Sequence, residues 1–166
     1  MNWFRILALF GPLSMWTGCS SLNAPWEKQV VFLAAEGFRG PFIIRIDSTS
    51  DVLPAIRGRE VIYTIPRSRV LTVKTLEVSN GSLWGNYRVQ YPSGQTVSPA
   101  SIDRGMDEAR AYLWPDGSQK SSDENIVTFF VGRFGEHSKL RDLSNFNMLK
   151  GIEIWERSDQ ADGVSP

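Results

Sequence analysis

Short apolar runs that alternate with polar residues and stop at Gly, Pro, Asn or Ser limit the fold of this chain more than any other feature. Their two-residue period is that of a β-strand with one buried face. In the run 42–47, for example, Phe42, Ile44 and Ile46 share one apolar face. The runs predict strands over 29–35, 42–47, 61–65, 70–76, 87–91, 109–114 and 125–132, with a last short strand at 152–154.

One segment has a different period. Apolar residues recur every three positions between Ser138 and Lys150, which places them on one face of a helix. Ser138 fits the N-cap and Gly151 fits a C-terminal stop. Seven or eight short strands with a single helix predict a mostly β protein, namely a small antiparallel β-sandwich with one short helix near the C-terminus.

The first 18 residues have the three-part layout of an export signal. Arg5 makes the start basic, an uncharged apolar stretch runs from Ile6 to Trp16, and small residues precede Cys19. A helix that spans a bilayer needs about 20 apolar residues, and Pro12 interrupts this shorter stretch. The segment therefore predicts a signal peptide rather than a permanent transmembrane helix.

The sequence Thr17-Gly18-Cys19 resembles the lipobox of bacterial lipoproteins, in which Leu, a small residue and Gly or Ala precede Cys. Trp16 stands in the Leu position. The resemblance implies cleavage before Cys19, a diacylglyceryl thioether on its sulfur, and acyl chains such as palmitate on the new amine. Ser20 resembles the enterobacterial signal for delivery to the outer membrane. An ordinary cleaved signal and an uncleaved anchor, with Cys19 incidental, are the alternatives.

These features divide the chain into four parts. We expect a signal peptide at 1–18, the lipidated Cys19 with a tether at 19–28, a β-sandwich domain at 29–157 and a flexible tail at 158–166. The composition, 42% hydrophobic and 22% charged, is close to that of globular proteins and supports a packed core. The predicted location is the cell membrane or the outer membrane, lipid-anchored, with the domain facing the periplasm or the exterior.

The domain itself also resembles a known group. Ala34–Phe42 is similar to the opening motif, Ile-Pro-Glu-Gly-aromatic-x-Gly, of a family of uncharacterised secreted bacterial β-sandwich domains. Residues 63–71 resemble that family's second Ile-Pro motif, and 129–132 resemble its closing strand. Ala35 replaces the Pro of the first motif, and Arg69 replaces a Gly of the second. The likeness covers 31–149 and implies a transthyretin-like or immunoglobulin-like sandwich, without implying an activity.

The opening motif has a structural interpretation of its own. Glu36-Gly37-Phe38-Arg39-Gly40 predicts a tight turn between two strands. Gly37 and Gly40 are expected at positions of positive φ, and Phe38 is expected to cap the core. We favour this turn over a ligand-binding loop.

Charge gives one candidate binding site. The chain has 18 basic and 18 acidic residues, a balance that argues against a nucleic-acid binder. Basic residues nevertheless dominate between 39 and 88. If Arg57, Arg59, Arg67 and Arg69 converge at one end of the sandwich, they form a site for an acidic envelope protein or an anionic envelope component. The alternative is that these arginines are scattered surface charges.

Catalytic chemistry has little support. The only histidine, His137, is expected in a solvent-exposed loop at the helix start, and lipid would consume the only cysteine. We therefore predict a non-enzymatic, membrane-anchored lipoprotein that acts as a binding module, with no cofactor and no metal. One alternative is a small-ligand or ion-binding protein that uses the acidic Asp103–Glu124 region. Another is a hydrolase built on a close carboxylate pair.

Overall fold

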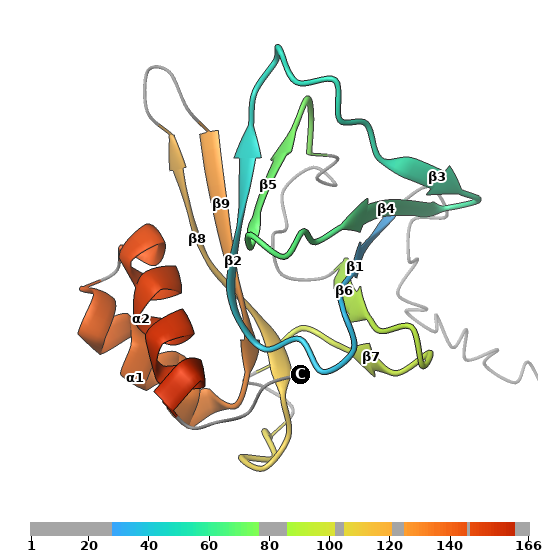
Figure 1. Ribbon diagram of the computed structural model, residues 1–166. Helices are drawn as coiled ribbons and strands as arrows, with labels where there is room; N and C mark the ends of the chain where they lie inside the picture. The colour runs from blue at the N-terminus through green and yellow to red at the C-terminus, as the bar shows by residue number, and fades with distance from the viewer. Residues whose placement is uncertain (1–27, 77–85, 102–104, 121–124, 146, 162–166) are drawn as a thin grey trace, which may run out of the picture.

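The computed structural model describes residues 28–76, 86–101, 105–120, 125–145 and 147–161. These residues form two β-sheets and two helices in three layers (Figure 1). The second sheet lies in the middle, with the first sheet on one face and both helices on the other. The predicted signal peptide and Cys19 lie outside the described residues.

The first sheet has the strand order β3-β4-β1-β6-β7. Its strands are β1 (Gln29–Leu33), β3 (Ala55–Arg57), β4 (Glu60–Thr64), β6 (Tyr87–Gln90) and β7 (Thr96–Val97).

The second sheet has the order β5-β2-β9-β8. Its strands are β2 (Gly40–Ile46), β5 (Val70–Val73), β8 (Tyr112–Lys120) and β9 (Asn125–Gly132).

Two of the crossings between the sheets run in the same direction. β1 continues into β2, and β4 continues into β5, so the chain changes sheet each time. β1 pairs in parallel with β4, and β2 pairs in parallel with β5. The crossing loops 34–39 and 65–69 therefore lie side by side, and the Ile65 amide donates to the Leu33 carbonyl over 2.8 Å. The predicted mostly β fold is confirmed, but its sheets are mixed rather than antiparallel.

The main core lies between the sheets and centres on aromatic rings. The ring of Phe32 lies 5.2 Å from that of Phe42 and 5.1 Å from that of Phe129. Neighbouring residues of β2 face opposite sides of the sheet. Phe42 faces the main core, whereas Ile43 points to the opposite face and packs against Ile152. The second sheet is thus buried on both faces, which explains the nearly continuous apolar sequence of β9.

The C-terminal part differs from the prediction. It forms two helices, α1 (Phe134–Ser144) and α2 (Met148–Ala161), separated at Asn145, whose φ is 50°. The expected strand at 152–154 is wrong, because this segment belongs to α2 and packs its apolar face on the second sheet. Gly151 lies inside α2 rather than ending a helix. The expected tail at 158–166 begins within this helix, and 162–166 lie outside the described residues.

Two further differences concern strands. Pro115-Asp116-Gly117, which follow the predicted strand at 109–114, lie inside β8 and interrupt its register with β9 at a bulge. The short edge strands β3 and β7 have too few residues to show a period in the sequence. Within the described residues, no helix is both long enough and apolar enough to cross a bilayer.

Candidate functional site

The structure separates the four candidate arginines into two pairs. Arg57 and Arg59 lie at the β3–β4 turn, before β4 begins, whereas Arg67 and Arg69 follow β4 in the second crossing loop. Because a strand rises about 3.3 Å per residue, the five residues of β4 hold the pairs roughly 15 Å or more apart. The expected convergence of all four arginines is therefore wrong.

Arg67 and Arg69 line a cleft of about 940 Å³. The two crossing loops form one wall of this cleft, and the helices α1 and α2 form the other. The basic side chains in its lining are Arg39, Arg67, Arg69 and Lys139, and the acidic ones are Glu36 and Glu136. The cleft thus gathers the predicted turn motif, two of the four predicted arginines and the C-terminal helices.

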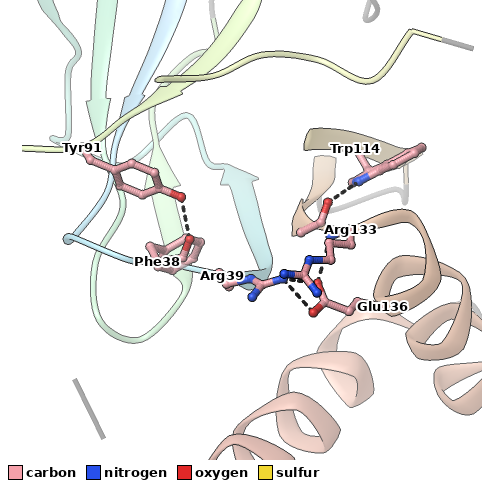
Figure 2. A network of polar contacts seen from close by, with 7 residues as sticks. Phe38, Arg39, Tyr91, Trp114, Arg133 and Glu136 are labelled. Carbon is pink, nitrogen blue, oxygen red and sulfur yellow. Dashed lines mark hydrogen bonds and ion pairs between the residues drawn. The ribbon is translucent and has the colours of Figure 1, made fainter. Parts of the chain in front are cut away.

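The first crossing loop holds Phe38 at the edge of the core. Gly37 and Gly40 have φ values of 71° and 97°. The Phe38 ring meets Phe42 edge-on at 6.0 Å and packs against the main core. Tyr91 donates a 2.8 Å hydrogen bond from its hydroxyl to the Phe38 carbonyl (Figure 2). Burial raises the pKa of Tyr91, so the hydroxyl keeps its proton and remains a donor.

Gly40 allows helix α2 to approach this loop closely. A Cβ atom at Gly40 would lie 2.4 Å from Nε1 of Trp155, a distance that real Cβ atoms do not reach. Trp155 in turn meets Phe130 of β9 edge-on at 5.3 Å. Because Gly40 has no side chain, the Trp155 indole packs directly against the backbone at this position.

Arg39 fastens the same loop to helix α1. Its Nη2 donates to both carboxylate oxygens of Glu136, at 2.7 and 2.6 Å (Figure 2). The Glu136 carboxylate also accepts a 2.8 Å bond from the Arg133 amide in a capping box at the helix start. The positive charge of Arg39 is thus largely neutralised by Glu136 within the protein.

Arg69 joins the two crossing loops. Its Nη1 donates a 2.7 Å hydrogen bond to the Arg39 carbonyl, and its guanidinium lies 4.7 Å above the Phe38 ring. Its Nε is 3.8 Å from a carboxylate oxygen of Glu156. Arg69 also has a φ of 60°, a left-handed conformation that costs a non-glycine residue about 1–2 kcal/mol. Its position and contacts indicate a structural role.

Among the basic side chains that line the cleft, Arg67 and Lys139 are the two that can bind a ligand. Both side chains are exposed, and in the described part of the chain neither pairs with an acidic side chain. Glu36, the other acid of the lining, accepts bonds from the amide and hydroxyl of Ser93. The cleft can therefore offer two unneutralised cations to an anionic group.

His137 is buried, which corrects the expectation of an exposed loop residue. It is 5% exposed, and its ring stacks on Trp114 with centroids 5.0 Å apart. Its Nε2 lies 3.1 Å from Oδ1 of Asp116, and Nε of Arg141 lies 3.3 Å from the same oxygen. The bulge in β8 turns Asp116 towards helix α1. Asp116, His137 and Arg141 thus join the helix layer to the second sheet, with the imidazole buried against Trp114.

Asp116→Asn is expected to lower the free energy of unfolding by about 1–3 kcal/mol, since a charged hydrogen bond to a buried partner contributes about that much. The Asp116 side chain is only 4% exposed, so water cannot replace the carboxylate. Urea unfolding measures the loss. Asp107→Asn is the matched control, because Asp107 is exposed and its carboxylate accepts a bond from the nearby Ala109 amide. Equal midpoints for the two variants would contradict a structural role for Asp116.

In the described part of the acidic region, Asp107 and Asp116 lie at separate places. Asp116 faces helix α1, whereas Asp107 accepts a bond from the Ala109 amide in a separate turn. Asp103, Asp123 and Glu124 lie outside the described residues. In the part of the chain that the structure describes, no three His, Cys, Asp or Glu side chains are arranged to hold a metal ion. Among the described residues, the side chains that contact Asp116 are the His137 ring and the Arg141 guanidinium, and neither is the second carboxylate of the hydrolase alternative.

Comparison with known proteins adds little. No family model matches the chain, and no curated protein matches it. Among solved structures, one titled a crystal structure of a "Putative Lipoprotein from Bacillus anthracis" is similar, with a TM-score of 0.42 and 15% identity. The match covers 64% of this chain and 71% of that chain. A likeness of this level assigns neither a fold nor a function.

Proposed function

We propose that the chain is a lipid-anchored binding module of the bacterial cell envelope, which takes an acidic segment of a partner protein into the cleft between the crossing loops and the helices. The observation that carries the proposal is the lining of this cleft. Arg67 and Lys139, which pair with no acid among the described residues, lie there beside apolar side chains. The resemblance of Thr17-Gly18-Cys19 to a lipobox supports the anchor.

The size and lining of the cleft favour a protein segment over a small anion. About 940 Å³ is in the range of pockets that enclose drug-sized ligands and greatly exceeds the volume of a phosphate ion. Leu143, which is 53% exposed, and the half-buried Phe38 and Trp155 offer apolar contacts next to the cations. An extended segment with both acidic and apolar side chains satisfies both kinds of contact.

The double variant Arg67→Gln/Lys139→Gln is expected to bind an acidic, leucine-containing peptide about two- to thirtyfold more weakly than the parent at low salt. Each exposed ion pair contributes about 0.2–1 kcal/mol, and 1.4 kcal/mol corresponds to tenfold in affinity. Fluorescence anisotropy of the labelled peptide with the full chain measures the difference. The difference should shrink as salt rises, because the Debye length falls to about 10 Å at 0.1 M.

The matched control is Arg57→Gln/Arg59→Gln, which removes the same charge at the other end of β4. This variant should bind the peptide as the parent does. Equal affinities of all three proteins for the peptide would exclude the cleft as the binding site. If the parent binds a neutral peptide of equal length as tightly as the acidic peptide, the proposal of an acidic partner is wrong.

A further inference from the structure

The strand directions place the start of the domain and the cleft at opposite ends of the first sheet. β1 begins at Gln29 and leads into the first crossing loop, which lines the cleft. The Gln29 amide donates to the Arg59 carbonyl over 2.9 Å, so the β3–β4 turn lies beside the start of β1. We call this end of the sheet the tether end. At about 3.3 Å per residue, it lies roughly 20 Å from the cleft.

Apolar side chains are exposed at the tether end. Val52, Leu53 and Ile56 are 47%, 68% and 64% exposed, and we call these three residues the apolar edge. They precede or belong to β3, the outermost strand of the first sheet. The Lys74 amide donates to the Val52 carbonyl over 3.2 Å, which holds this segment against the end of β5. Figure 1 shows the segment at the opposite side of the molecule from the first crossing loop.

Basic side chains surround the apolar edge. Arg57, Arg59 and Lys74 are exposed, and among the described residues their side chains pair with no acid. Among the described residues, the acids at this end are Asp47, Asp51 and Glu60. The Asp47 carboxylate accepts bonds from the amide and hydroxyl of Thr49, and Glu60 is paired with Arg88. Exposed aliphatic side chains flanked by cations match a bilayer surface that carries anionic headgroups.

We propose that the apolar edge and its flanking cations form a membrane-contact surface, which lies against an anionic bilayer and directs the cleft away from it. This inference rests on the proposed lipid anchor. Nine residues lie between Cys19 and Gln29, and the ten residue-to-residue steps that join them span at most about 35 Å in any conformation. A lipid on Cys19 therefore keeps the tether end near the bilayer, within reach of its headgroups.

A fluorescent label at position 56 tests the contact. Cys19 is the only cysteine, so lipidation leaves the thiol of the Ile56→Cys variant as the only one open to an environment-sensitive dye. The full lipidated chain is placed in vesicles of phosphatidylcholine with phosphatidylglycerol. We expect a blue-shifted emission and loss of most of it when the lipids carry a quencher. Adding Arg57→Gln/Arg59→Gln should weaken both effects.

Gln95→Cys is the matched control, because Gln95 is exposed in the turn that follows β6, at the cleft end of the sheet. Its label should report water and resist quenching. If the label at 56 behaves in the same way, the membrane contact is wrong although the anchor holds. A blue-shifted label at 56 in the vesicle-free Cys19→Ser chain would also overturn the contact, because another segment or a second copy would then cover the edge. Failure of the parent to enter vesicles, with an unmodified Cys19, would instead contradict the proposed function.

Discussion

Replacing Gly40 with alanine is expected to lower the free energy of unfolding by about 2–5 kcal/mol, a large part of the 5–15 kcal/mol typical of a domain. Two costs add at this position. Its φ of 97° lies in a region that L-residues rarely adopt, and a Cβ would lie 2.4 Å from Nε1 of Trp155. Overpacking of this kind costs about 1–3 kcal/mol beyond the backbone strain. Urea unfolding followed by tryptophan fluorescence measures the loss.

Gly37→Ala separates the two costs. Gly37 also has a positive φ, of 71°, but a Cβ there would meet no atom within 4 Å. This variant should therefore lose only the conformational cost, about 1–2 kcal/mol. If the two alanine variants unfold at the same urea concentration, a Cβ at position 40 adds no steric cost. That result would contradict the close packing of Trp155 on Gly40.

Cys19→Ser is expected to remove the protein from the detergent phase entirely. Each acyl methylene buried in lipid contributes about 0.8 kcal/mol, so two or three chains hold a protein firmly and their loss releases it. The chain has no second cysteine that could carry the thioether. Partition between detergent and water, followed by blotting, measures the change, and the variant should appear as a water-soluble or an unprocessed species.

Ser21→Ala is the matched control for this experiment, because it alters a small side chain two residues later without touching the sulfur. It should partition as the parent does. Identical partition and identical processing of the parent and Cys19→Ser would show that the anchor is not at Cys19.

Strand periodicity allowed the inner faces of the strands to be predicted but not the strand partners. The alternation from Phe42 to Ile46 correctly placed Phe42 and Ile44 in the core. The same two-residue period occurs in parallel and antiparallel strands, so it cannot show that β1 pairs in parallel with β4. The sequence did not predict the helix α2 over 152–154, because a short apolar run fits both a strand and a buried helix.

The site was only partly accessible to sequence reasoning. Arg67 and Arg69 were candidates because they are close in sequence. The partners that give the cleft its properties are distant in sequence, as Arg39 and Glu136 show, which are 97 positions apart. No sequence signal linked Asp116 to His137, because their contact depends on a bulge in β8. Long-range pairing of this kind appears only once the layers are packed.

The proposed function and the proposed membrane contact both depend on a lipid at Cys19, and mass spectrometry of the N-terminal peptide from membrane-extracted protein tests this directly. The account predicts a peptide that begins at Cys19 and carries a diacylglyceryl group on its sulfur. A peptide with a free Cys19 thiol, or one that still contains residues 1–18, would contradict it.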